Sequence, residues 1–194
     1  YRFTVNEDGS LRKRRFSLTD KQEYYNCLID PSENIETFKF IMNTWSGIYS
    51  LDFLNKYHIR HNETPGASYQ DNGFWFQTFC RAKRAWFVNK PYYMNRRDNP
   101  NSSMFYRQKV YCVTEEYRYI WDWMSKEPEL IKKYSAIFYM KKYSNFMVTY
   151  RRIAEPLRME YLHHICDEFR KPMQEGKRSE EHTSELQSRF DLVC

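Results

Sequence analysis

The pattern of apolar and polar residues changes near residue 105. Before that point the runs are short: Tyr1–Val5 alternates as a strand does, residues 6–10 have the composition of a turn, and Leu11–Phe16 can return as a hairpin partner. Beyond it, apolar residues recur every three or four positions, which predicts helices. We therefore expect a mixed α/β part over residues 1–105 and a helical part over residues 106–177.

Several short elements are expected within the first part. Thr19 or Asp20 can cap a short helix that ends near Cys27, and the apolar, aromatic run Ile41–Tyr49 is typical of a buried strand. The other expected elements are a short helix over Ser50–Tyr57, a loop over 62–70, a helix over Asp71–Ala82, and short strands over Ala85–Val88 and Tyr92–Arg96.

Three amphipathic helices are expected in the second part. Pro128 suits the first turn of the second helix, which runs to about Tyr150, and Pro156 suits the start of the third. The apolar stripes of the first and third helices are Val110, Val113, Tyr117, Ile120 or Trp121, and Met124, and then Leu157, Tyr161, Leu162, Ile165 and Phe169.

Composition excludes several classes of protein. The 194 residues include 17 Tyr, 14 Phe and 5 Trp, so the core is expected to be rich in aromatic side chains. Only five Gly occur and no Gly-rich loop, which excludes a P-loop or a dinucleotide-binding motif. The five Cys are scattered without a Cys-x-x-Cys pair, which argues against a disulfide framework or a structural zinc site and suits a reducing compartment.

Both ends of the chain have unusual features. The chain begins at Tyr1 inside a predicted strand, and we expect it to be a fragment. Residues 178–194 lose the helical periodicity, and their portion RSEEHTSELQS resembles the translation of a sequencing-library adapter. We expect an artefactual tail there, with a natural polar tail as the alternative. The net charge is +6, and it becomes +8 without the two Arg and four acidic residues of this tail.

Asp71 is the strongest local candidate for chemistry. It follows the Pro-Gly loop TPGASYQ and opens a predicted helix among Tyr69, Phe74, Trp75 and Phe76. A carboxylate in this position can accept a proton from an alcohol as a general base. The alternative is a helix cap, a role worth about 1 kcal/mol, and the spacing alone favours the cap.

Cationic residues form a second group of candidates. The guanidinium groups of Arg96 and Arg97 suit phosphate oxygens, although adjacent arginines often only face solvent. Other basic patches, interleaved with aromatic residues, can bind single-stranded nucleic acid or anionic lipid headgroups, or serve only solubility. Because the patches are spread along the chain, the nucleic-acid interpretation is weaker. They are Arg12–Arg15, Arg81–Arg84, Lys132–Lys133, Lys141–Lys142 and Arg151–Arg152.

The histidines do not predict a metal site. His58 and His61 lie beside a loop, and His163 and His164 point in different directions on one helix. No Cys or carboxylate completes a recognisable set of ligands with them. We expect structural or surface roles for these side chains.

Residues 44–103 contain an ordered series of landmarks. They are Trp45 to Tyr49, Phe53–Leu54, Ile59 to Glu63, Gln70–Asp71, Ala82 to Arg84, Tyr92–Tyr93, Arg96 and Asn99 to Ser103. With these landmarks the segment resembles the C-terminal half of a family 2 glycosyltransferase catalytic domain, and the similar members are bacterial enzymes that build capsule or lipopolysaccharide sugars. Residues 106–177 fit the helical extension of such enzymes less specifically.

The resemblance implies a fold and a reaction. The fold is a partial Rossmann-like (GT-A type) nucleotide-sugar transferase domain, and the reaction is inverting transfer of a sugar from a nucleotide-sugar donor to a hydroxyl of a cell-surface glycan acceptor. Asp71 matches the general base, and Arg96 matches a position near the diphosphate of the donor. The expected substrate-binding residues are Trp45, Gln70, Trp75, Arg96 and Ser102.

The chain also departs from the family pattern. The nucleotide-binding first half is absent, and with it the Asp-x-Asp that holds a divalent metal, magnesium or manganese. Ser46 and Gly47 stand where a Lys often occurs. We therefore expect this fragment to be inactive by itself and its full-length parent to be the enzyme.

The resemblance and the charge also bear on partners and location. A cytoplasmic protein in peripheral contact with the anionic inner face of the cell membrane would suit the charge of +8. No nucleic-acid partner is expected. A basic, aromatic nucleic-acid-binding module is the alternative function, and a non-catalytic scaffold descended from a transferase is a third possibility.

Overall fold

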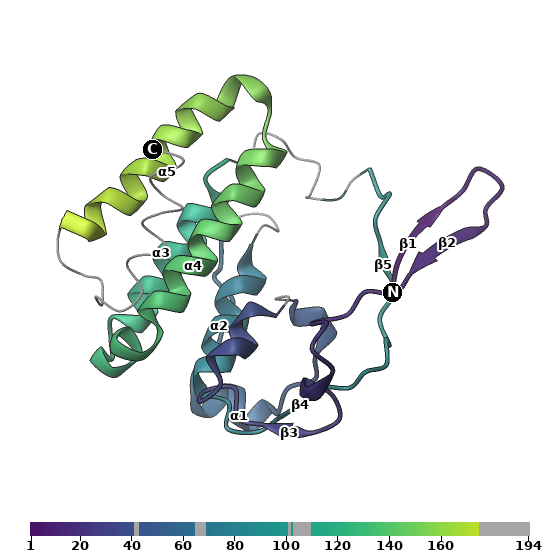
Figure 1. Cartoon of the computed structure of the whole chain (residues 1–194), viewed down its shortest axis with the longest axis horizontal. Helices are drawn as coiled ribbons and strands as arrows, with labels where there is room; N and C mark the ends of the chain where they lie inside the picture. The colour runs from purple at the N-terminus through teal and green to yellow at the C-terminus, as the bar shows by residue number, and fades with distance from the viewer. Residues whose placement is uncertain (41–42, 65–68, 101, 103–109, 175–194) are drawn as a thin grey trace. The chain divides into compact units, whose positions relative to one another are not determined.

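The computed structural model describes residues 1–40, 43–64, 69–100, 102 and 110–174 (Figure 1). The chain forms two compact units, Tyr1–Phe105 and Tyr106–Cys194. The first unit mixes short strands with helices, and the described part of the second is helical. The mixed α/β class predicted from the sequence is therefore confirmed.

The first unit carries its strands in two small sheets. One sheet has the order β2-β1-β5 and the other pairs β3 with β4. The strands are β1 (Arg2–Val5), β2 (Leu11–Arg14), β3 (Leu28–Ile29), β4 (Ala85–Trp86) and β5 (Asn95–Arg96). The helices are α1 (Leu51–Lys56) and α2 (Gln70–Arg81), and the 3-10 turns are η1 (Gln22–Tyr24), η2 (Ile35–Lys39) and η3 (Thr44–Ser46).

The predicted N-terminal hairpin is confirmed. Strands β1 and β2 pair antiparallel, with Arg2 opposite Arg14 and Val5 opposite Leu11. The turn between them places Gly9 at a φ of 79°, a left-handed conformation that glycine adopts without steric cost. Strand β5 pairs parallel with the other side of β1, so residues far apart in the sequence form one three-stranded sheet.

Helix α2 is the core of the first unit. The sequence predicts one apolar face, but residues 72–80 are all buried. Phe38 of η2 has no exposed surface and lies edge-on to Trp75, Phe76 and Phe79, with ring centroids 5.4 to 5.8 Å apart. Burying such large side chains stabilises the contact between η2 and α2.

Two predicted elements are wrong. Within 43–49, the described part of the expected buried strand, the backbone forms the 3-10 turn η3, Trp45 is 40% exposed and Ile48 is fully exposed. The expected helix ending near Cys27 is reduced to η1. Apolar residues favoured a strand at 41–49, but the backbone here closes its hydrogen bonds locally, with Gly47 N donating to the Thr44 carbonyl at 3.4 Å.

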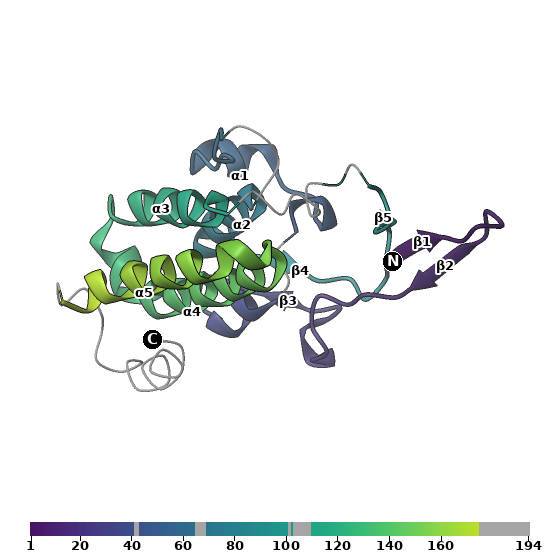
Figure 2. The ribbon, with the colours of Figure 1, turned by 90° about the horizontal axis from the view of Figure 1, so that it is seen from above.

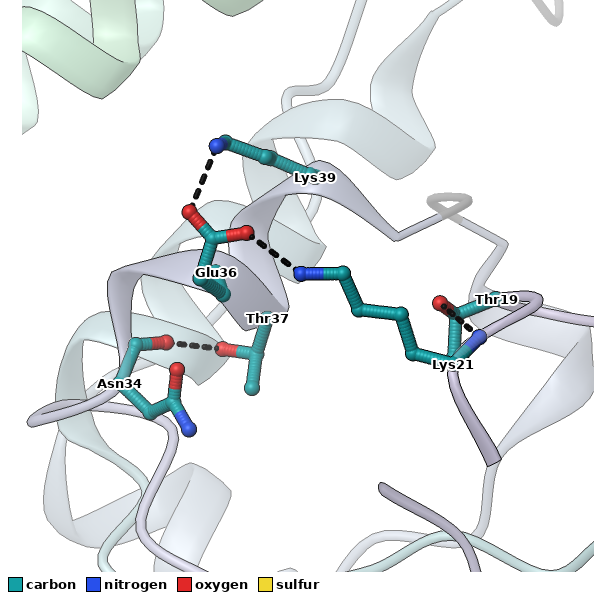
Figure 3. A network of polar contacts seen from close by, with 6 residues as sticks. All are labelled: Thr19, Lys21, Asn34, Glu36, Thr37 and Lys39. Atoms are coloured by element: carbon teal, nitrogen blue, oxygen red, sulfur yellow. Dashed lines mark hydrogen bonds and ion pairs between the residues drawn. The ribbon is translucent and has the colours of Figure 1, made fainter. Parts of the chain in front are cut away.

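A polar cluster on the surface holds η2 beside the segment that leads into η1 (Figure 3). Glu36 accepts from Lys21 at 3.0 Å and from Lys39 at 2.5 Å, and Thr37 donates to the Asn34 carbonyl at 2.7 Å. The two lysines hold the pKa of Glu36 below its usual value. Because these groups are exposed and already paired with one another, we assign the cluster a modest structural role and no chemistry.

The described part of the second unit forms three α-helices. They lie side by side in both views (Figures 1 and 2). The short turn η5, which contains Pro156, precedes the last of them. The helices are α3 (Cys112–Met124), α4 (Pro128–Arg152) and α5 (Arg158–Gln174), with η5 at Glu155–Leu157. The predicted stripes are confirmed where their members are fully buried, namely at Val113, Tyr117, Ile120, Met124, Tyr161, Ile165 and Phe169.

A buried ion-pair network joins the three helices of the second unit. Glu168 of α5 accepts from Lys142 of α4 at 2.8 Å and from Arg118 of α3 at 2.9 Å. The side chains of Lys142 and Glu168 are only 8% and 14% exposed. Burial alone would raise the pKa of Glu168, but the two cations outweigh it and lower that pKa. Glu168 therefore stays ionised and neutralises a lysine that would otherwise be a buried, uncompensated charge.

Candidate functional site

The candidate site is built where helix α2 begins. Tyr69 occupies the N-cap position with a φ of 67°, and the first two residues of the helix are Gln70 and Asp71. A left-handed backbone at a residue other than glycine costs on the order of 1 kcal/mol, and such residues cluster at functional sites. Asn72 supports the turn by donating its side-chain amide to the Tyr69 carbonyl at 2.9 Å. Asp71 is thus not the N-cap, and the cap interpretation is wrong.

Asp71 is a half-buried carboxylate. Burial is the largest influence and raises its pKa, while its own backbone N–H, His61 and Asn72 act in the opposite direction. Asn72 donates its side-chain amide to Oδ1 of Asp71 at 3.3 Å. Within the part of the chain that the structure describes, no Lys or Arg forms an ion pair with it. A desolvated carboxylate without a paired cation is a stronger proton acceptor than an exposed one.

Replacing Asp71 with Asn is expected to stabilise the first unit. The raised pKa means that ionising Asp71 at neutral pH destabilises the fold, and Asn keeps the shape without the charge. We expect a gain on the order of 1 kcal/mol in the free energy of unfolding at neutral pH. The gain should shrink as the pH falls below the ordinary carboxyl range, where both folded and unfolded wild type are protonated. Denaturant titrations at several pH values would measure it, and a loss of stability at neutral pH would show a cap-like role instead.

His61 is a site residue that the sequence analysis missed. Its ring stacks on Phe74 with centroids 4.5 Å apart, and its charge is one of the influences that lower the pKa of Asp71. Nδ1 lies 3.2 Å from the Gln70 carbonyl, and because a carbonyl only accepts, this bond requires the proton on Nδ1. The available signal is the place of His61 inside the landmark segment Ile59 to Glu63.

Gln70, the first residue of α2, is hydrogen-bonded to Thr64. Its side-chain nitrogen donates to the hydroxyl of Thr64 at 2.9 Å and to the Thr64 carbonyl at 3.3 Å. These bonds connect Gln70 with Thr64, and the predicted loop residues 65–68 lie outside the described residues. Gln70 therefore has a visible role in positioning the residue next to it, Asp71.

Trp45 lies against the tyrosine-rich segment. Its ring stacks on Tyr93 with centroids 4.4 Å apart, and the turn η3 that carries it contacts α2. Four residues further on, Tyr49 packs edge-on to Phe74 of α2 at 5.1 Å. Trp45 and Tyr93 remain 40% and 47% exposed, so their paired rings can still contact a ligand. Three landmarks that are distant in the sequence thus meet around α2.

Arg96 has hydrogen-bond donors that can still bind a ligand. Its Nε donates to Asp98 at 2.7 Å, and the other oxygen of Asp98 accepts from Val5 N at 2.6 Å. The Arg96 side chain is 54% exposed, and no bond to its two Nη groups is found among the described residues. Ser102 is half-buried, and its backbone N–H donates to the Asn99 carbonyl at 3.0 Å.

Trp75 needs a correction. It was expected to bind substrate, but it is only 4% exposed and its ring stacks on Phe79 with centroids 3.8 Å apart. The helical periodicity places residue 75 one turn after Asp71, yet residues 72–80 of α2 are all buried. Packing in the core explains Trp75, and we do not include it in the proposed site.

The described residues contain neither a metal site nor a membrane-spanning helix. They contain no group of three or more His, Cys, Asp or Glu side chains placed to hold a metal ion. None of their helices combines the length and the apolar character needed to cross a bilayer. No family model, curated protein or solved structure matches this chain.

Proposed function

We propose that this chain is the C-terminal half of an inverting family 2 glycosyltransferase with a partial Rossmann-like domain. The observation that carries the proposal is the half-buried carboxylate of Asp71 at the start of α2, which has no Lys or Arg partner among the described residues. The stacked rings of Trp45 and Tyr93 come from η3 and the tyrosine-rich segment, and η3 contacts the same helix. The acceptor is a glycan hydroxyl and the donor a nucleotide sugar.

In the proposed reaction Asp71 acts as the general base. The acceptor oxygen forms a bond to the anomeric carbon of the donor sugar while the bond from that carbon to the nucleoside diphosphate breaks. The leaving diphosphate keeps the electron pair, and the acceptor proton passes to Asp71. The Nη groups of Arg96 can bind the phosphate oxygens as charge develops there.

A divalent metal would supply charge neutralisation for the leaving diphosphate in such an enzyme. The described residues offer no set of ligands for it, so no step of the mechanism proposed here passes through a metal. The residues of this chain are assigned to the acceptor side and to one contact with the diphosphate.

The assignment of Trp45 can be tested with a matched pair of tryptophans. We expect Trp45→Ala to raise the KM for the glycan acceptor about tenfold in the full-length protein, because a stacking contact on a sugar is worth about 1 kcal/mol or slightly more. Trp86 in β4 is also exposed, at 58%, and lies outside the proposed site. Trp86→Ala should leave the KM unchanged, and equal effects from the two variants would remove Trp45 from the site.

A further inference from the structure

The sheet β2-β1-β5 carries four arginines on one face. Arg2 lies directly opposite Arg14 across the antiparallel pair, and Arg12 follows on the same side of β2 because alternate residues share a face. Arg96 pairs with Phe3 on the opposite face of the sheet. The next residue, Arg97, therefore lies on the same face as Arg2. We refer to Arg2, Arg12, Arg14 and Arg97 together as the arginine face.

The charges of the arginine face repel one another. Burial, then the charge of Arg97 and then the charge of Arg14 lower the pKa of Arg2, and no carboxylate is among the influences on it. In the described part of the chain, none of the four guanidinium groups forms an ion pair with an Asp or Glu. Like charges placed opposite each other destabilise a strand pair. A counter-ion bound to the arginine face would relieve this repulsion.

Residues elsewhere on this sheet contrast with the arginine face. Arg96, one residue before Arg97, has a carboxylate partner, since its Nε donates to Asp98 at 2.7 Å. Arg15, just beyond β2, donates to the Asn89 carbonyl at 2.9 Å. Because β2 is exposed, the charges of Arg12 and Arg14 are available to an external anion.

The chemistry of the face favours a membrane over a nucleic acid. Single-stranded nucleic acids bind where exposed rings stack on bases beside cations. The ring of Phe16, next to this face, is covered by the guanidinium of Arg2, which lies 3.4 Å from the ring centroid. Four cations grouped beside a covered ring match a layer of phosphate headgroups, which attracts basic groups without stacking.

We propose that the arginine face docks this chain onto a bilayer of anionic phospholipids, with the guanidinium groups against the phosphate headgroups. This docking does not depend on the transferase reaction, so either proposal can fail without the other. It gives a definite surface to the membrane contact that the net charge suggests.

The test measures binding of the full chain to two kinds of vesicle by co-sedimentation. One kind is phosphatidylcholine alone, and the other is an equal mixture of phosphatidylcholine and phosphatidylglycerol. Each basic residue near an anionic surface strengthens binding about fivefold, so we expect Arg12→Gln to weaken binding to the mixed vesicles about fivefold and the double variant with Arg14→Gln about twentyfold. The matched control is Lys13→Gln, which removes an exposed charge from the opposite face of β2 and should have little effect.

Three further arms separate the membrane from other sources of phosphate. The charge-preserving pair Arg12→Lys and Arg14→Lys should bind mixed vesicles nearly as the wild type does, because a headgroup layer responds to charge. Loss of binding in that pair, or displacement from vesicles by inorganic phosphate at constant ionic strength, would indicate a small-anion site and overturn the proposal. Equal weakening of vesicle binding by Lys13→Gln would also overturn the proposal. So would a result in which binding of a single-stranded oligonucleotide depends on Arg12 and Arg14 while binding to the vesicles does not.

Discussion

Asp71→Asn lowers kcat for sugar transfer by a factor of about 10² to 10⁴ in the full-length protein, because the amide cannot take the proton of the acceptor hydroxyl. The KM for the nucleotide sugar should change little, since Asp71 is assigned to the acceptor and not to the diphosphate. Steady-state kinetics with varied donor and varied acceptor would measure both effects. A variant that transfers sugar at the wild-type rate would contradict the role of Asp71.

The control for this experiment is another aspartate in the first turn of a helix. Asp52 begins α1 as Asp71 begins α2, but its side chain is exposed. Asp52→Asn should leave kcat unchanged.

The pH profile adds a second test: because burial raises the pKa of Asp71, the acid limb of kcat should lie above the ordinary carboxyl range in the wild type and disappear in Asp71→Asn. Together with the expected gain in stability of this variant, the loss of rate would show a residue kept for function at some cost to the fold.

Glu168→Gln destabilises the second unit by about 3–5 kcal/mol, since it leaves Lys142 buried beside an amide that cannot balance its charge. Denaturant unfolding followed by circular dichroism would measure the change. Glu129→Gln is the matched control, because Glu129 is exposed at the start of α4 and its replacement should stay within about 0.5 kcal/mol. Adding Lys142→Met to Glu168→Gln removes the stranded charge and should restore part of the loss. If the single variant unfolds like the wild type, the pair contributes nothing.

The same network predicts a direction for acid sensitivity. The pKa of Glu168 is lowered in the folded state, because Lys142 and Arg118 outweigh the effect of burial. A lowered carboxyl pKa contributes stability above the unfolded pKa and loses it as the pH falls through the folded pKa. We therefore expect the wild type to lose this contribution only in acid below the ordinary glutamate range, and Glu168→Gln to lack that part of the pH dependence.

The structure follows the sequence pattern where local chemistry decides it. The alternation in Tyr1–Val5 and the turn before Leu11 specify a hairpin, and the stripe through Val113 and Tyr117 specifies a helix face. The predicted strand is wrong within residues 43–49, because an apolar run becomes a strand only if a partner strand supplies hydrogen bonds. Periodicity also does not reveal that residues 72–80 of α2, Trp75 among them, are all buried.

The candidate site divides in the same way. The sequence by itself determined the residue types: a carboxylate opening a helix, an aromatic landmark at Trp45 and an arginine near a tyrosine-rich segment. Only the tertiary structure decided how solvated and how paired they are. It desolvates Asp71, brings His61 to it and ties Arg96 to Asp98. Burial and charge pairing depend on neighbours distant in the sequence, and these neighbours set whether a carboxylate acts as a base and whether an arginine is free to bind an anion.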